Sequence, residues 1–281
     1  MKAKEFRTEA REKLAGKWGK AALISFLYLS IGFVLGIIDG YFGEFFQNLK
    51  SLFSIITYVV VIPLAFGLNV SYFKLFKGEE IETFDFIKDG FNNFKISWAI
   101  MLRTALKMIV PIVALILCEI AMSVLGISLV VTRNSTVATS LLLFCVAYIA
   151  VLIWMVTITY KYKLATLIVI ENPETSAKEA IEKSWELMKG NRLKLFGLHF
   201  SFIGWGILSL FTIYIGLFWL LPYISISTIA FYKHLKGEEK TEVAQEIVEE
   251  KPEEVVQEIE EKTEEVSEET EKVEDVSEGN E

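Results

Sequence analysis

The sequence predicts an all-α, polytopic membrane protein with about six transmembrane helices and with amphipathic helices at the cytoplasmic interface. Of the 281 residues, 53% are apolar and 13% are aromatic, and the mean hydropathy is +0.42. These values are high for a soluble domain. Long apolar runs alternate with charged stretches, and lysine and arginine gather in every second stretch. Together these observations favour a chain that crosses a membrane several times.

Apolar segments of sufficient length are the predicted spans, because a hydrocarbon core of about 30 Å takes about 20 helical residues to cross. They are 21–38, 52–73, part of 96–131, 137–158, 195–213 and 217–231. The third run would be roughly 54 Å long as a helix, so we expect its excess to lie along the inner interface with Trp98, Arg103 and Lys107. We expect a turn over 212–216, at Gly216, between the last two spans.

The basic residues predict the orientation, because cytoplasmic loops carry the excess of positive charge. Twenty lysines and arginines lie on one side of the predicted membrane, in residues 1–20, 74–95, 159–194 and 233–237. The alternate loops hold only Lys50 and Arg133. We therefore expect a multi-pass protein of the cell membrane with both termini in the cytoplasm. A signal peptide is the alternative for the N-terminus, but its leader would contain Glu5, Glu9 and Glu12, so we expect the first span to be retained.

The charge divides the chain into a basic body and an acidic tail. Residues 238–281 hold 20 acidic and 4 basic side chains, a net charge of −16, so the remaining residues carry +8. We expect three regions: a basic amphipathic segment over 1–20, a six-span membrane domain over 21–235 and an acidic cytoplasmic tail over 236–281. A glutamate-rich composition is typical of disorder. A 3-4 spacing of valine, isoleucine and threonine within the tail leaves a transient helix or weak coiled coil open.

Each pair of spans follows a short amphipathic stretch. Apolar or small side chains recur at helical spacing at Ala3, Phe6, Ala10 and Leu14, at Ile81, Phe84, Ile87, Phe91 and Phe94, and at Ala177, Ala180, Ile181, Ser184 and Met188. The third stretch begins with a capping box of Ser176 and Glu179 and ends before Gly190. The pattern indicates three copies of an interfacial helix plus a hairpin. The alternative is that any cytoplasmic segment entering a bilayer is amphipathic and basic.

Two parts of the sequence are similar to a known family. These are RTEAR at 7–11, and then EAIEKSWELMKGNR at 179–192, FIGW at 202–205, LPY at 221–223 and FY at 231–232. They resemble an uncharacterised family of bacterial multipass integral membrane proteins, a domain of unknown function. That family is distantly similar to the membrane domain of glycerophosphodiester phosphodiesterases. The resemblance implies a helical membrane fold and brings no catalytic residues, because the phosphodiesterase chemistry resides in a separate barrel domain.

No catalytic motif stands out in the sequence. The two histidines, His199 and His234, belong to no metal-binding motif, and no glycine-rich phosphate loop is present. Cys118 and Cys145 lie in apolar runs and offer neither a disulfide framework nor metal-ligand spacing. We therefore expect no enzyme activity, no cofactor and no metal. His199 is expected to make a polar contact near the membrane interface.

Glu119 is the candidate intramembrane polar site, since it lies near the midplane of the third span. It is either a protonatable or cation-binding site or a neutral, hydrogen-bonded acid, and we favour the neutral acid. Arg103 and Lys107 share a helical face and are candidate contacts for lipid phosphate at the inner leaflet; snorkelling anchors are the favoured alternative.

Three glycines in the first span, Gly32, Gly36 and Gly40, form two GxxxG spacings and are candidates for close helix packing. We favour packing within the chain over homodimerisation. Pro63 and Pro111 lie inside spans and could kink them, which is a weak indication of transport.

For function, we expect a non-enzymatic integral membrane protein that organises proteins or lipids at the inner leaflet. Its expected partners are the bilayer, anionic lipids and other membrane proteins, with no nucleic acid. The alternative is a small permease or transporter accessory subunit with Glu119 as its polar site. A polar cavity that reaches Glu119 would favour the permease, and a packed apolar bundle would favour the organising module.

Overall fold

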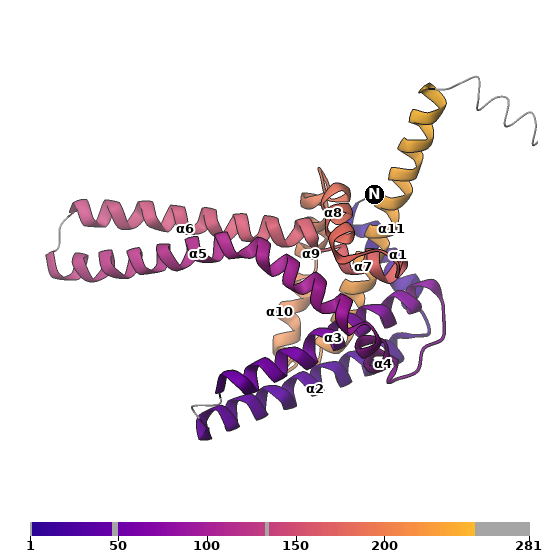
Figure 1. Ribbon diagram of the computed structural model, residues 1–281, viewed down its shortest axis with the longest axis horizontal. Coiled ribbons are helices and arrows are strands. Elements are labelled where there is room, and N and C mark those ends of the chain that lie inside the picture. Colours follow the sequence, from indigo (N-terminus) through magenta and orange to yellow (C-terminus); the bar gives the residue numbers. More distant parts are fainter. Residues whose placement is uncertain (1, 47–49, 133–134, 251–281) are drawn as a thin grey trace, which may run out of the picture. The chain divides into compact units, whose positions relative to one another are not determined.

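The computed structural model describes residues 2–46, 50–132 and 135–250 of the chain. The helices in this part, shown in Figure 1, are α1 (Ala3–Leu14), α2 (Trp18–Phe45), α3 (Lys50–Lys77), α4 (Asp85–Asn92), α5 (Phe94–Thr132), α6 (Ser135–Tyr162), α7 (Ala165–Glu171), α8 (Ala177–Leu187), α9 (Arg192–Phe200), α10 (Ile203–Phe211) and α11 (Leu217–Glu250). No strand occurs among the residues described. The predicted all-α fold is confirmed.

Five helical stretches in the described residues are long and apolar enough to cross a membrane. They are Trp18–Tyr41, Ser51–Lys77, Phe94–Val131, Thr136–Glu171 and Arg192–Phe211. The predicted sixth span, 217–231, forms the start of α11 and is not among them. It has 15 residues before the polar sequence that starts at Tyr232, fewer than the roughly 20 that a span needs. The polytopic membrane fold is therefore confirmed, but five described helical stretches, not six, are long and apolar enough to cross a membrane.

α5 is one continuous helix of 39 residues, roughly 58 Å long, so the expectation of a run longer than one span is correct. Pro111 lies inside α5 without ending it. α5 and α6 pack side by side (Figure 1). Only 6% of the most apolar window of each is buried within the chain. These two helices thus expose most of their apolar side chains, as lipid-facing helices do.

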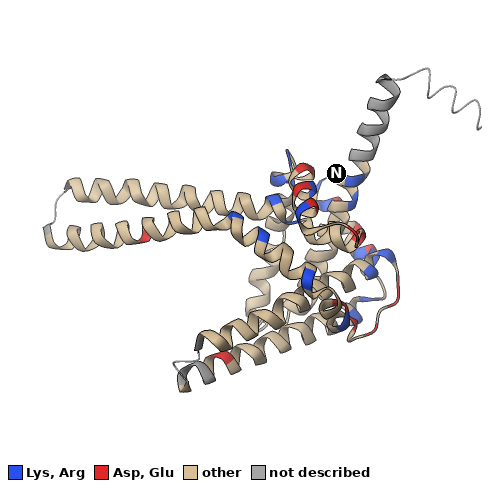
Figure 2. Cartoon of the chain, in the orientation of Figure 1, with Lys and Arg blue, Asp and Glu red and all other residues tan. Residues whose placement is uncertain are grey.

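The short helices α1 and α4 pack on the long helices through their apolar faces. α1 buries Phe6, Ala10 and Leu14 and contacts α3 and α9. α4 packs on α3 and buries Phe86 and Gly90. Figure 2 shows charged residues gathered on the short helices and on the helix ends beside them, whereas the far stretches of α2, α3, α5 and α6 carry few. The predicted stripe of α1 therefore contacts protein. The stripe predicted for the second stretch was wrong in part, because Phe84 and Phe91 are exposed and α4 packs through Phe86 and Gly90 instead.

α8 confirms the predicted helix boundaries. The Ser176 hydroxyl accepts a hydrogen bond from the Glu179 N–H, and the Glu179 carboxylate accepts one from the Ser176 N–H. Gly190 adopts a φ of +73° after this helix, and Gly16 adopts the same φ after α1, a left-handed conformation that favours glycine. Gly90 lies inside α4 instead. The first and third amphipathic stretches thus share a glycine ending that the second lacks.

The turn between α10 and α11 differs from the prediction that placed it at Gly216. Ile213 and Tyr214 adopt the left-handed backbone, with φ of 51° and 64°. Gly216 serves a different purpose, because a Cβ there would lie 2.6 Å from the Ser209 hydroxyl oxygen. The Gly216 N–H also donates to Thr212 Oγ1 at 3.1 Å. The glycine therefore permits a close approach to α10, while two larger residues take the strained conformation.

The chain divides into two compact units, Met1–Tyr232 and Lys233–Glu281. The first contains the five candidate spans and the short helices. In the second, helix α11 continues to Glu250, so 236–250, the first part of the predicted acidic tail, is helical. The rest of that tail, 251–281, lies outside the described residues.

Candidate functional site: a basic cavity beside helix α8

A cavity of about 570 Å³ lies between α5, α6 and α8. Its lining residues are Arg103, Leu106, Lys107, Lys161, Tyr162, Lys178, Ile181, Glu182 and Trp185. The structure therefore brings the two predicted phosphate contacts, Arg103 and Lys107, together with lysines from two other helices. We call this space the basic cavity.

Local sequence rules explain how each helix contributes to the basic cavity. Arg103 and Lys107 are four residues apart in α5, one turn of helix, so they share a face. α8 is held beside them by Ser184, which is fully buried. The Ser184 hydroxyl accepts from the Leu164 N–H at 3.2 Å and donates to the Lys161 carbonyl oxygen at 3.0 Å. These two bonds tie α8 to the end of α6.

Trp185 gives the basic cavity an aromatic wall. The ammonium nitrogens of Lys161 and Lys189 lie 5.7 and 4.9 Å from the centre of its ring, within the range of cation–π attraction. The Trp185 side chain is 42% exposed. An aromatic ring of this kind orients the lysines and offers a flat apolar surface to a ligand.

The charges around the basic cavity are unbalanced. Four cationic side chains line it, and the only carboxylate in the lining is Glu182, which lies 3.9 Å from Lys178. Arg103 and Lys107 form no ion pair with any residue that the structure describes. A planar guanidinium and several ammonium groups around one space favour an oxyanion such as phosphate. The geometry thus suits the headgroup of an anionic lipid or another phosphate.

Glu119, the predicted intramembrane polar residue, lies away from the basic cavity. Its carboxylate accepts a hydrogen bond of 3.4 Å from the Tyr148 hydroxyl of α6, and the residue is exposed on the surface of α5. A second cavity, of about 490 Å³, has both polar and apolar lining residues and extends along α5 as far as Met108 without reaching Glu119. We call this space the polar cavity because a lysine, a histidine and several hydroxyl groups line it, and Glu119 is not part of it.

The predicted glycine contacts lie elsewhere. In the described chain, a Cβ added at Gly32, Gly36 or Gly40 would meet no atom within 4 Å. Close helix packing occurs instead between α3 and α4, where a Cβ at Gly67 would lie 1.8 Å from the Phe86 carbonyl oxygen. Sequence reasoning missed this contact because Gly67 and Gly90 stand in separate segments with no shared motif.

His199 makes the polar contacts that were expected of it, with Tyr160 at 3.0 Å and with Thr228 at 3.1 Å. Lys163 was counted only among the loop charges, yet it lines the polar cavity. No sequence motif indicated this role, because the cavity is formed by segments that are distant in the chain. Among the residues described, no group of histidines, cysteines and carboxylates could hold a metal ion.

These features define the class of protein: a polytopic membrane protein of α-helices. Residues 1–239 match the family described as Protein of unknown function (DUF975), and the chain belongs to this family. No curated protein and no solved structure matches the chain. The distant similarity to the membrane domain of glycerophosphodiester phosphodiesterases therefore has no support. The family match ends at residue 239, so nearly all of the acidic tail lies outside it.

Proposed function

We propose that this protein is a non-enzymatic membrane module that binds anionic phospholipid headgroups at the inner leaflet through the basic cavity. The observation that carries the proposal is the convergence of Arg103, Lys107, Lys161 and Lys178 from three helices on one space. Through bound lipid the module would organise lipids or partner proteins around it. The cytoplasmic orientation of this end is part of the proposal, and the distribution of basic residues supports it.

The permease alternative gains no support from Glu119. That residue lines none of the three described cavities, and its hydrogen bond with Tyr148 of the neighbouring helix suits a packing role. Binding of lipid headgroups needs only the cations and the aromatic wall that the basic cavity already has.

Lipid binding can be tested by native mass spectrometry of the full-length protein released from nanodiscs of phosphatidylcholine with phosphatidylglycerol. The wild type should retain phosphatidylglycerol. Arg103→Gln with Lys107→Gln removes two cations, each worth about 1 kcal/mol near an anionic surface, so phosphatidylglycerol should bind about 30-fold more weakly.

The matched control is Lys183→Gln with Lys194→Gln, which removes two exposed lysines that line no described cavity. This control should bind as the wild type does. Equal loss in both double variants would mean that the lipid responds to total charge rather than to the basic cavity. Unchanged binding in the Arg103 and Lys107 variant would refute the proposal.

A further inference from the structure

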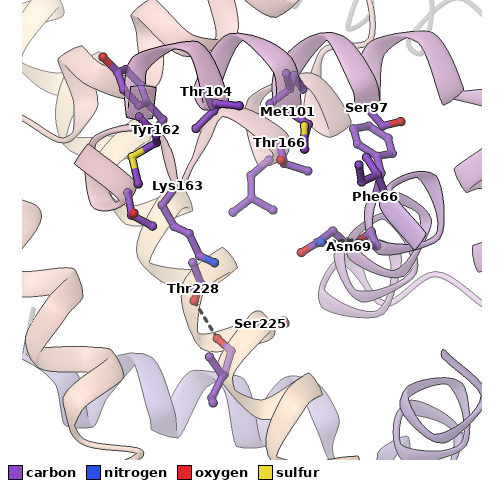
Figure 3. A pocket seen from close by; sticks show the side chains of 18 of the residues that line it. Phe66, Asn69, Ser97, Met101, Thr104, Tyr162, Lys163, Thr166, Ser225 and Thr228 are labelled. Atoms are coloured by element: carbon purple, nitrogen blue, oxygen red, sulfur yellow. Dashed lines mark hydrogen bonds between the residues drawn. The ribbon is translucent and has the colours of Figure 1, made fainter. Parts of the chain in front are cut away.

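The polar cavity of about 490 Å³ is formed by segments from much of the first unit. Its lining residues come from α3, α5, α6, α7, α9 and α11 and from the junction between α6 and α7. Volumes of this size are typical of small-molecule sites. Figure 3 shows Lys163 extending from that junction toward Thr228 and Ser225 of α11. The cavity therefore has a cationic side chain that reaches across it.

Lys163 is the only lysine, arginine, aspartate or glutamate among the lining residues. It has no ion pair and no hydrogen bond with any residue in the described part of the chain. Lys163 lies between α6 and α7 and is an exposed residue, so its ammonium group is accessible to a ligand in the cavity. Since the protein supplies no carboxylate here among the described residues, the chemistry of the site favours an anionic ligand.

Three hydroxyl groups around the cavity are available to a ligand. Thr104, Thr166 and Ser225 line the cavity and keep part of their surface accessible, and none of their side chains bonds to a residue that the structure describes. Other hydroxyls in the lining differ, because Ser97 and Thr159 donate to carbonyl oxygens of their own helices. The available donors thus come from α5, α7 and α11, and Figure 3 shows the end of Lys163 pointing toward the α11 side of the cavity.

The hydrogen bonds of His199 fit a neutral imidazole. Thr228 Oγ1 donates its proton to the Ile224 carbonyl oxygen at 2.8 Å, so it accepts from His199 Nε2–H. A neutral imidazole then accepts the Tyr160 hydroxyl proton at Nδ1, and every group is satisfied. His199 therefore positions Thr228 and Tyr160, and Lys163 remains the charged group of the cavity.

Much of the rest of the cavity wall is apolar. Ile62, Phe66, Ile100, Met101 and Met108 contribute to it from α3 and α5. Methionine side chains adapt to irregular apolar ligands. A ligand with one anionic group and one apolar part would match both portions of the lining.

We propose that this cavity binds an organic phosphate, whose phosphate group is held by Lys163 with the hydroxyls of Thr166 and Ser225, and whose apolar part lies along Met101 and Met108. A phosphate has more acceptor oxygens than a carboxylate and so can use this number of donors. The phosphate could belong to a lipid headgroup or to a soluble phosphate ester. The inference is independent of lipid binding at the basic cavity, since the proposed ligand contacts differ.

The test uses full-length protein in neutral dodecyl maltoside and records the midpoint of thermal unfolding during titration with dodecyl phosphate. Lys163→Met keeps much of the side-chain length but removes the charge. Binding of dodecyl phosphate should weaken by about tenfold or more in this variant, because a charge-assisted bond is lost. Lys183→Met is the matched control for loss of a lysine, because Lys183 is exposed and lines no described cavity, and it should bind as the wild type does.

Two further arms complete the experiment. Glycerol phosphate in place of dodecyl phosphate distinguishes the sources: saturation by both supports a soluble ester, and saturation by dodecyl phosphate alone supports a lipid. If Lys163→Met does not fold, Thr166→Val with Ser225→Ala should weaken binding by about tenfold. The proposal is overturned if dodecanol stabilises as strongly as dodecyl phosphate, if neither phosphate binds, or if the cavity variants keep wild-type affinity.

Discussion

Gly67 of α3 and Gly90 of α4 let two helices touch through their backbones. A Cβ at Gly67 would lie 1.8 Å from the Phe86 carbonyl oxygen, and one at Gly90 would lie 2.4 Å from the Pro63 carbonyl oxygen. Backbone atoms cannot move aside as the end of a flexible side chain can. These two positions therefore require glycine for steric reasons, even though both residues are helical and have ordinary dihedral angles.

We predict that Gly67→Ala and Gly90→Ala each lower the free energy of unfolding by about 1–3 kcal/mol or more, because overpacking forces the helices apart. Gly36→Ala is the matched control, since its Cβ meets open space in the described chain. It should stay within about 1 kcal/mol of the wild type. Reversible unfolding in mixed micelles measures all three. Wild-type stability of Gly67→Ala would show that α3 and α4 do not pack this closely.

The transport and packing hypotheses predict different effects of substitutions at Glu119. If it is a neutral packing acid, Glu119→Gln keeps its size and can still accept the Tyr148 hydroxyl proton. We therefore predict that Glu119→Gln leaves stability and membrane levels nearly unchanged. Glu119→Lys should cost about 2.5–3.5 kcal/mol of insertion, since it carries a charge into hydrocarbon. Equal damage from both variants would mean that ionisation of Glu119 matters.

At the scale of helices, α8 shows what local rules predict and what they miss. The capping box, the buried stripe and the glycine after the helix all follow from residues within a few positions of one another, and each is confirmed. The partner of the stripe could not be predicted in this way. Ser184 was expected to lie on the buried face, but its bonds to Leu164 and Lys161 depend on where the end of α6 lies.

We predict that Ser184→Ala loosens α8 and weakens the basic cavity. The substitution leaves the Leu164 N–H and the Lys161 carbonyl oxygen without the hydroxyl that each bonds, which costs about 1–3 kcal/mol for unsatisfied buried groups. Lys183→Ala, on an exposed position of the same helix, should have little effect. Hydrogen exchange of the amides of α8 would report the difference. Unchanged exchange in Ser184→Ala would contradict this account.

For the whole molecule, composition and charge pattern predicted the membrane fold, while the cavities depended on packing between distant segments. Arg103 and Lys107 were recognisable as a pair because they are one turn apart. Lys161, Lys163 and Lys178 appeared only as members of the basic excess, and the structure divides them between two cavities. For the predicted sixth span, 217–231, hydropathy did not distinguish a buried helix from a membrane span, because apolar residues of α11 such as Ile226 and Phe231 are buried inside the protein.

Our central proposal is that the chain crosses the membrane several times and that its basic end, which holds the basic cavity, faces the cytoplasm. Its most direct test is labelling of single cysteines with an impermeant thiol reagent in intact cells, after Cys118 and Cys145 have been replaced. Lys50→Cys and Arg133→Cys should react from outside, and Lys88→Cys and Lys183→Cys should react only after the membrane is opened. Labelling of Lys88→Cys or Lys183→Cys in intact cells, with protection of Lys50→Cys, would contradict the account.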